Sequence, residues 1–121
     1  MKVDTRKIYA DPNEFYVLEG SFAMILEPQA AMSVCESSFD HGQLISRIEG
    51  GIWSDNKFQP RGDCIWDGAD PPIRDEDART NNAAASRFIK MQVMDINAFV
   101  LTTALIKNSR QDQRGEKGNT Q

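Results

Sequence analysis

One stretch of this chain concentrates side chains that suit recognition of another molecule. Its carboxylates are Asp63, Asp67, Asp70, Asp75, Glu76 and Asp77. Arg74 is the only basic residue between them, and the two tryptophans of the chain, Trp53 and Trp66, lie close by. Concentrated negative charge speeds association with positively charged clefts, and tryptophan is enriched at binding hot spots. We therefore expect these carboxylates and tryptophans to form a docking surface for a basic protein partner.

Two other interpretations of this stretch stay open at the level of sequence. The carboxylates also suit a solvated loop whose charge keeps the protein in solution, and either tryptophan also suits a small core. A calcium loop is not favoured, because the segment from Asp67 to Asp70 lacks the alternating carboxylate spacing that such loops use.

The residue types needed for catalysis or for holding a cofactor are scarce. His41 is the sole histidine, and its neighbours are typical of a turn rather than of a catalytic base. Cys35 and Cys64 form no C-x-x-C pair, so we expect two reduced thiols and no metal site. A single disulfide between them stays open. The glycine pair at 50–51 is not followed by a phosphate-binding motif. The sequence therefore predicts a protein that is not an enzyme and that binds no cofactor.

Length and charge limit the remaining classes. With 121 residues, 40% of them hydrophobic, the chain is long enough for one globular core. A formal net charge of −4 disfavours binding to nucleic acid or to an anionic membrane. No apolar run is long enough to cross a membrane, and the N-terminus lacks the pattern of a secretory signal. We expect one cytoplasmic domain over residues 1–110 and a disordered tail over 111–121, which has no large apolar side chain.

Local patterns predict several short strands. Residues 14–26 are rich in aromatic and β-branched side chains and predict a strand with a bend at Gly20-Ser21. Residues 43–53 predict a second strand that Gly50-Gly51 interrupts. Residues 86–94 alternate between apolar and polar side chains most clearly of all, which predicts a half-buried strand.

The other segments are less regular. Residues 54–82 predict a long connection with a brief strand at 64–66, and residues 29–38 predict either one helical turn or an irregular loop. Asp95 suits the N-cap of a helix over 96–108, although β-branched residues in that segment leave a strand open. Together these elements predict an α+β fold, in which a mostly antiparallel sheet of about four or five strands is covered by one or two packed helices.

Three short motifs between residues 8 and 53 resemble a known family. Residues 8–15 lead through a D-P turn into an aromatic segment, and residues 41–44 and 48–52 follow as a hairpin bounded by glycine. The hairpin has the form G-x-[L/F]-x-x-x-I-x-G, whose positions are occupied by Gly42, Leu44, Ile48 and Gly50. These motifs resemble small immunity proteins of bacterial polymorphic-toxin and contact-dependent growth inhibition systems.

The resemblance implies a cytoplasmic, non-catalytic protein that binds one cognate toxin and neutralises it. Such toxins are frequently nucleases with basic clefts, which agrees with the acidic stretch. Two alternatives belong to other classes. One is a small-molecule-binding or enzymatic domain with a pocket lined by Tyr16, Phe22 and Trp53. The other is a homo-oligomeric structural protein of a mobile element, whose tryptophans would meet at the interface between copies.

Overall fold

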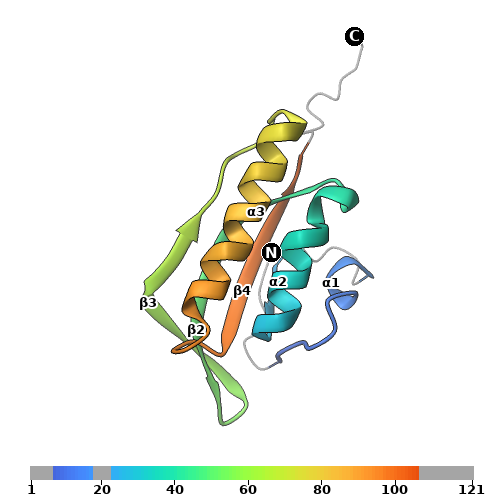
Figure 1. Ribbon diagram of the computed structural model, residues 1–121. Helices are drawn as coiled ribbons and strands as arrows, with labels where there is room; N and C mark the ends of the chain where they lie inside the picture. Colours follow the sequence, from blue (N-terminus) through green and yellow to red (C-terminus); the bar gives the residue numbers. More distant parts are fainter. Residues whose placement is uncertain (1–6, 18–22, 107–121) are drawn as a thin grey trace.

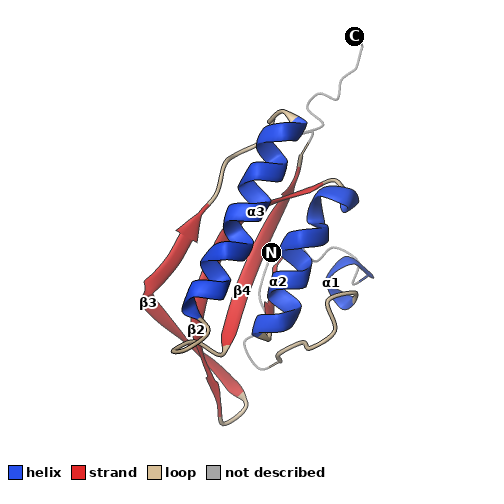
Figure 2. Cartoon of the chain, viewed as in Figure 1, coloured by secondary structure: helices blue, strands red, loops and turns tan. Residues whose placement is uncertain are grey.

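The computed structural model describes residues 7–17 and 23–106, and its centre is a four-stranded sheet (Figure 1). The strand order is β1-β4-β2-β3, and every neighbouring pair is antiparallel. The strands are β1 (Ala23–Leu26), β2 (Gln43–Ser54), β3 (Lys57–Asp67) and β4 (Ala98–Leu105). The helices are α1 (Glu14–Val17), α2 (Pro28–Ser37), α3 (Asp75–Gln92) and the 3-10 helix η1 (Ser38–His41). Because α2 and α3 lie side by side across one face of the sheet (Figure 2), the predicted α+β fold is confirmed.

Strands β2 and β3 form a long hairpin. Its turn is made by Asp55 and Asn56, whose φ angles of +53° and +61° suit these residue types better than most. Further along, the pairing of β2 with β3 shifts register just before Gly51, where a side chain would collide with the ring of Phe58. The strand predicted over 43–53 is therefore confirmed, and its glycine pair produces a bulge without ending the strand.

Helix α2 occupies the segment for which the sequence predicted a helical turn or a loop. Pro28 lies in its first turn, where the missing backbone N–H costs nothing. The buried residues are mostly small, namely Ala30, Ala31, Val34 and Cys35. A helix face made of small side chains gives a weak hydrophobic pattern, which explains why the sequence left this segment undecided.

Helix α3 overturns two predictions. The strand predicted over 86–94 is wrong, because these residues lie in the helix and the turn that ends it. The long connection predicted over 54–82 is also wrong, because most of it forms β3 and the first turns of α3. The buried face of α3 consists of Ala78, Asn82, Ala85 and Ile89, at a spacing of three or four residues. The alternation that suggested a strand came partly from Met91, which is 79% exposed.

Two further segments also differ from the main prediction. The helix predicted over 96–108 is wrong, and the alternative of a strand is right, because β4 lies in the middle of the sheet between β1 and β2. Its β-branched residues suit that position. The single strand predicted over 14–26 is replaced by α1 and β1. The bend at 20–21 and the tail at 111–121 lie outside the described residues.

The two faces of the sheet pack differently. On the helix-covered face, alternate strand residues such as Leu26, Ile48 and Phe99 pack against α2 and α3 to form the main core. On the opposite face, a small apolar cluster forms around Ile25 and Val100. Among the helices of the described residues, none is long and apolar enough to span a membrane.

Candidate functional site: an acidic edge

The six carboxylates that the sequence singled out lie on an outer strand of the sheet, in the loop after it and in the first turn of α3. Strand β3 is an outer strand of the sheet, and the chain runs from it through a loop into the first turn of α3 (Figure 1). All six residues are exposed. We call them the acidic edge: Asp63 and Asp67 on β3, Asp70 in the loop, and Asp75, Glu76 and Asp77 in α3.

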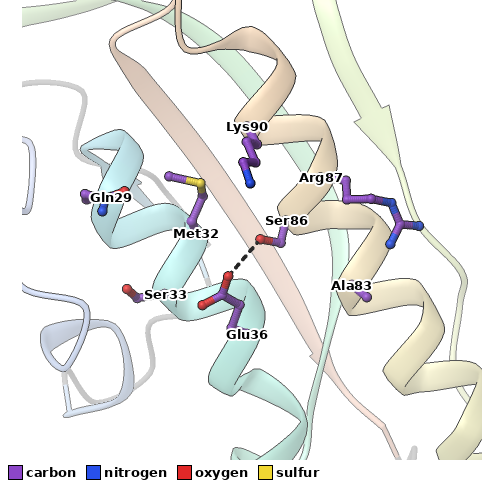
Figure 3. A pocket seen from close by; sticks show the side chains of 8 residues that line it. All are labelled: Gln29, Met32, Ser33, Glu36, Ala83, Ser86, Arg87 and Lys90. Carbon is purple, nitrogen blue, oxygen red and sulfur yellow. Dashed lines mark hydrogen bonds between the residues drawn. The ribbon is translucent and has the colours of Figure 1, made fainter.

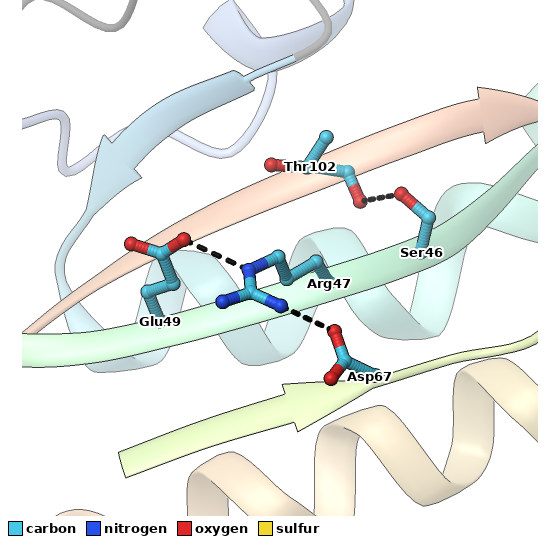
Figure 4. Close-up of polar contacts among 5 residues, drawn as sticks. All are labelled: Ser46, Arg47, Glu49, Asp67 and Thr102. Atoms are coloured by element: carbon cyan, nitrogen blue, oxygen red, sulfur yellow. Dashed lines mark hydrogen bonds and ion pairs between the residues drawn. The ribbon is translucent and has the colours of Figure 1, made fainter. Parts of the chain in front are cut away.

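Arg47 on β2 pairs with the strand part of the acidic edge (Figure 4). Its Nε donates to Glu49 Oε2 at 2.9 Å and its Nη1 donates to Asp67 Oδ1 at 2.6 Å. Arg47 and Asp67 are directly opposite each other in the β2–β3 ladder. The hydrogen bonds from Arg47 to Glu49 and Asp67 raise the pKa of the guanidinium above its ordinary value. Since the Asp67 side chain is 67% exposed, water screens this pair and a competing cation can replace Arg47.

Two other arginines lie beside the acidic edge. Arg61 Nε is 3.8 Å from an Asp63 carboxylate oxygen. Arg74 Nε donates to Asp77 Oδ2 at 3.0 Å, and its Nη1 is 3.7 Å from Glu76 Oε1. These pairs are also largely in water, so each stabilises the fold by only about 0–1 kcal/mol.

Negative charge remains in excess along the edge. Three arginines stand against its carboxylates and Glu49, and within the described residues no ion pair is found for Asp70 or Asp75. Asp75 is also the first residue of α3, where the positive end of the helix dipole favours a negative side chain. The helix dipole therefore stabilises the Asp75 carboxylate and partly offsets its negative charge.

Two asparagines of α3 hold the start of β2, which extends beyond the end of β3. Asn82 Nδ2 donates to the Gln43 carbonyl at 3.0 Å, and Asn82 Oδ1 accepts from the Ile45 N–H at 2.9 Å. Asn81 Nδ2 donates to the Ile45 carbonyl at 2.8 Å, and its Oδ1 accepts from the Ala69 N–H at 2.8 Å. The amides thus take the place of a neighbouring strand and fix the loop between β3 and α3.

The two tryptophans lie on opposite faces of the sheet. Trp66 packs against the main core on the helix-covered face, next to Asp67 in sequence. Trp53 packs with Phe58 against the cluster around Val100 on the other face. Both are only partly buried. Because successive strand residues point to opposite faces, Asp67 points away from Trp66, to the face that carries Trp53. Asp75, Glu76 and Asp77 start α3, which covers the other face.

The cysteines are buried, and the single histidine makes contacts within the molecule. Both cysteines are free and buried, and burial raises the pKa of Cys35 and of Cys64, so neither thiol is activated as a nucleophile. The ring of His41 stacks on that of Tyr16 with centroids 3.5 Å apart. Its Nδ1 lies 3.1 Å from the Ser37 carbonyl oxygen. No group of His, Cys, Asp and Glu in the described part of the chain could hold a metal ion.

An aromatic pocket of the kind suggested by the alternative hypothesis is not formed by Tyr16 and Trp53. Tyr16 packs on the helix side, where its hydroxyl lies 2.7 Å from Ser37 Oγ and bonds the Val34 carbonyl at 3.0 Å. Trp53 packs on the other face of the sheet. The third residue, Phe22, lies outside the described residues.

A groove of about 520 Å³ runs between α2 and α3 (Figure 3). Glu36 of α2 reaches across it and accepts a hydrogen bond from Ser86 Oγ at 3.3 Å. Lys90 lies on the α3 side, and Arg87 turns away from α2 (Figure 3). An open groove with charges of both signs differs from the mostly apolar, enclosed pockets that bind small molecules.

Sequence reasoning missed three residues near the end of the acidic edge. Phe39 and Asp40 of η1 and Leu105 of β4 line a hollow beside Asp75. They come from distant parts of the chain and meet because β4 pairs with β2 at Gln43. No local motif marks them, so only the sheet register could have revealed the group.

Comparisons with known proteins show to which family the chain belongs. Residues 24–104, more than half of the chain, match the family described as Colicin-E5 Imm protein. A protein of Burkholderia pseudomallei named Immunity protein CdiI is 42% identical over 102 residues, which cover 84% of this chain and 94% of that protein. This chain therefore belongs to the colicin-E5 immunity protein family, and the resemblance to immunity proteins of toxin systems is confirmed.

Proposed function

We propose that this protein neutralises a cognate bacterial toxin by placing the acidic edge against a basic active-site cleft of that toxin. Its role is binding, and it carries out no reaction of its own. The same proposal places it in the cytoplasm of the cell that makes the toxin, where its thiols stay reduced.

The observation that carries this proposal is that all six carboxylates of the acidic edge are exposed in a member of an immunity family. A cleft that binds substrate phosphates presents clustered Lys and Arg, which these carboxylates complement. The edge suits a protein better than nucleic acid, because the phosphates of nucleic acid would be repelled. In this arrangement Trp53 supplies an apolar contact on the face to which Asp67 points. Trp66 supplies one on the helix-covered face, which also carries the α3 part of the edge.

Because the ion pairs of the acidic edge are exposed, its carboxylates can exchange the arginines of this chain for cations of the toxin. Arg47, Arg61 and Arg74 hold their carboxylates by pairs that water screens, so toxin cations can displace them at small cost. Asp70 and Asp75 have no ion pair among the described residues, so a toxin cation displaces no arginine there. We therefore assign the greater part of the binding energy to Asp70 and Asp75.

The proposal is tested with the toxin domain encoded by the adjacent reading frame. Co-expression should protect cells from that toxin, and the two proteins should co-purify with one copy of each by light scattering. Charge reversal at Asp75→Lys should weaken the complex by about 2–5 kcal/mol if the pair is desolvated, whereas reversal at the rim should mainly slow association.

A matched control is charge reversal at Asp95→Lys, an exposed position after α3 and away from the edge. It changes the net charge equally and should leave the affinity within a few-fold of the wild type. Failure of the pair to associate, or equal effects of both reversals, would contradict the proposal. A self-associating protein without affinity for the toxin would instead favour the structural alternative.

A further inference from the structure

The hollow at the α3 end of the acidic edge has features that the edge alone does not explain. It measures about 390 Å³ and is lined by Phe39, Asp40, Gly42, Asp75, Leu105 and Ile106. Apolar side chains form one part of its wall, and two carboxylates from different elements form another. Leu105 is 49% exposed here, although most other residues of β4 are buried.

From this geometry we propose that the hollow receives a single Lys or Arg side chain of the toxin. The inference rests on the proposed function and specifies which chemical group of the toxin meets one end of the acidic edge. Lys and Arg bury their methylene stems along apolar surface and keep the charged head at a polar rim. Leu105 and Ile106 offer the apolar wall for such a stem, and Asp40 and Asp75 offer acceptors for its head.

Arg79 covers the Phe39 ring beside the hollow: its guanidinium carbon lies 4.3 Å from the ring centroid. This ring therefore already has a cation from within the molecule. Asp40 also lines a second hollow, together with Glu36, Phe39 and Arg79. The charged head of an occupant is left to Asp40 and Asp75, and an anionic or purely apolar occupant would leave these two carboxylates desolvated without a partner.

The position of the hollow is fixed by the fold. The Ile106 N–H donates to the Gly42 carbonyl at 2.9 Å, which holds the end of β4 against the turn after η1. Asp75 is held by the start of α3, which Asn81 and Asn82 attach to β2. An occupant is therefore met by preformed walls, which reduces the entropy cost of binding.

The test uses the full-length protein and the catalytically inactive toxin domain from the adjacent reading frame. In Leu105→Arg the protein supplies its own guanidinium to the hollow. We expect this variant to bind the toxin at least about tenfold more weakly, mainly through faster dissociation. Asp40→Asn should weaken binding in the same direction. Thermal unfolding of Leu105→Arg should be close to that of the wild type, because Leu105 is half exposed.

Two controls separate the hollow from general electrostatics. Leu105→Gln removes the apolar wall without adding charge and should have a smaller effect than Leu105→Arg. Met94→Arg changes the net charge equally at a residue that is 91% exposed beyond the other end of α3, and it should leave the affinity nearly unchanged.

The outcomes distinguish this inference from the function on which it rests. If the wild type binds the toxin and Leu105→Arg binds equally well, the hollow receives no basic side chain and only this inference fails. Equal weakening by Leu105→Arg and Met94→Arg would also overturn it, because bulk charge would then explain both. If the wild type does not bind the toxin, the proposed function fails together with the inference.

Discussion

A side-chain amide pairs with the backbone at each end of strand β2, and this amide is buried at one end and exposed at the other. At the first end, the side-chain amide of Asn82 pairs with the backbone of Gln43 and Ile45, and Asn82 is only 3% exposed. At the last end, Asn97 accepts from the Trp53 N–H at 2.7 Å and donates to the Trp53 carbonyl at 3.2 Å, but it is exposed. Each amide imitates a missing neighbouring strand.

The comparison teaches that the geometry of a hydrogen bond does not set its contribution to stability. A backbone group that loses its partner in the interior remains desolvated, whereas one at the surface binds water instead. Asn82 also positions the start of α3 and with it the α3 end of the acidic edge. Asn97 lies at the other end of β2, away from the α3 end of the acidic edge.

The largest effect is expected for Asn82→Ala. This change leaves the Ile45 N–H and the Gln43 carbonyl without partners, so the free energy of unfolding should fall by about 2–4 kcal/mol. Urea unfolding followed by circular dichroism measures the change, with the slope against urea unaltered. A loss below about 1 kcal/mol would mean that water reaches these groups and would remove the proposed contrast.

The two buried cysteines, Cys35 and Cys64, also lie in different environments. Burial and then Glu36 raise the pKa of Cys35 above its ordinary value of 9.0. The folded state therefore keeps the proton at a pH where the unfolded chain loses it. The Cys35 proton contributes its full stabilisation below about pH 9. Above that pH, the free energy of unfolding should fall by up to about 1.4 kcal/mol per pH unit.

The measurement is urea unfolding between pH 8 and 10.5, with Cys35→Ala as the control. The alanine variant should be less stable throughout but should depend less steeply on pH. The two thiols should also differ in reactivity. Burial raises the pKa of Cys64, but a backbone hydrogen bond from Gly50 and the charge of Arg61 lower it and so oppose this effect.

Iodoacetamide should therefore label Cys64 before Cys35 in the native protein, and the reverse order would contradict this assignment.

A smaller effect is expected for Asn97→Ala, the exposed counterpart of Asn82→Ala. Because water can replace the amide at Trp53, the loss should stay below about 1 kcal/mol. The same urea titration serves for both variants. Equal losses for the two asparagines would show that burial does not decide the difference.

The smallest effect is expected for Asp67→Asn on the acidic edge. It removes one exposed ion pair of Arg47, so the free energy of unfolding should change little, and 1 M NaCl should abolish the difference. Thermal unfolding at low and high salt checks this. A large, salt-independent loss would show that Asp67 is committed to the fold and not available to a partner.

The fold class followed from the sequence, but the identity of single elements depended on which residues bury. The β2–β3 region was partly predictable, because aromatic and β-branched residues around Gly50-Gly51 mark strands. Helix α3 was missed because its buried face uses Ala78, Asn82 and Ala85, which a pattern based on large apolar residues does not detect. Residues 96–108 suit either a helix or a strand by composition. The segment forms a strand because β4 pairs with both β1 and β2 in the middle of the sheet.

The candidate site was predictable only where it is local in sequence. The carboxylates from Asp63 to Asp77 form a run that charge alone identifies. Asp40 and Leu105 join them through the pairing of β4 with β2, which a single sequence does not reveal. The separation of Trp53 from Trp66 likewise depends on the side to which each strand residue points.

Hydrogen–deuterium exchange on the complex with the cognate toxin domain tests the central claim most directly. Toxin binding should slow exchange of backbone amides over residues 63–77 and 39–42, at the acidic edge and the hollow beside it. Residues 91–97, at the other end of α3, should exchange as in the free protein. Protection confined to residues 91–97, with none along the edge, would contradict the account.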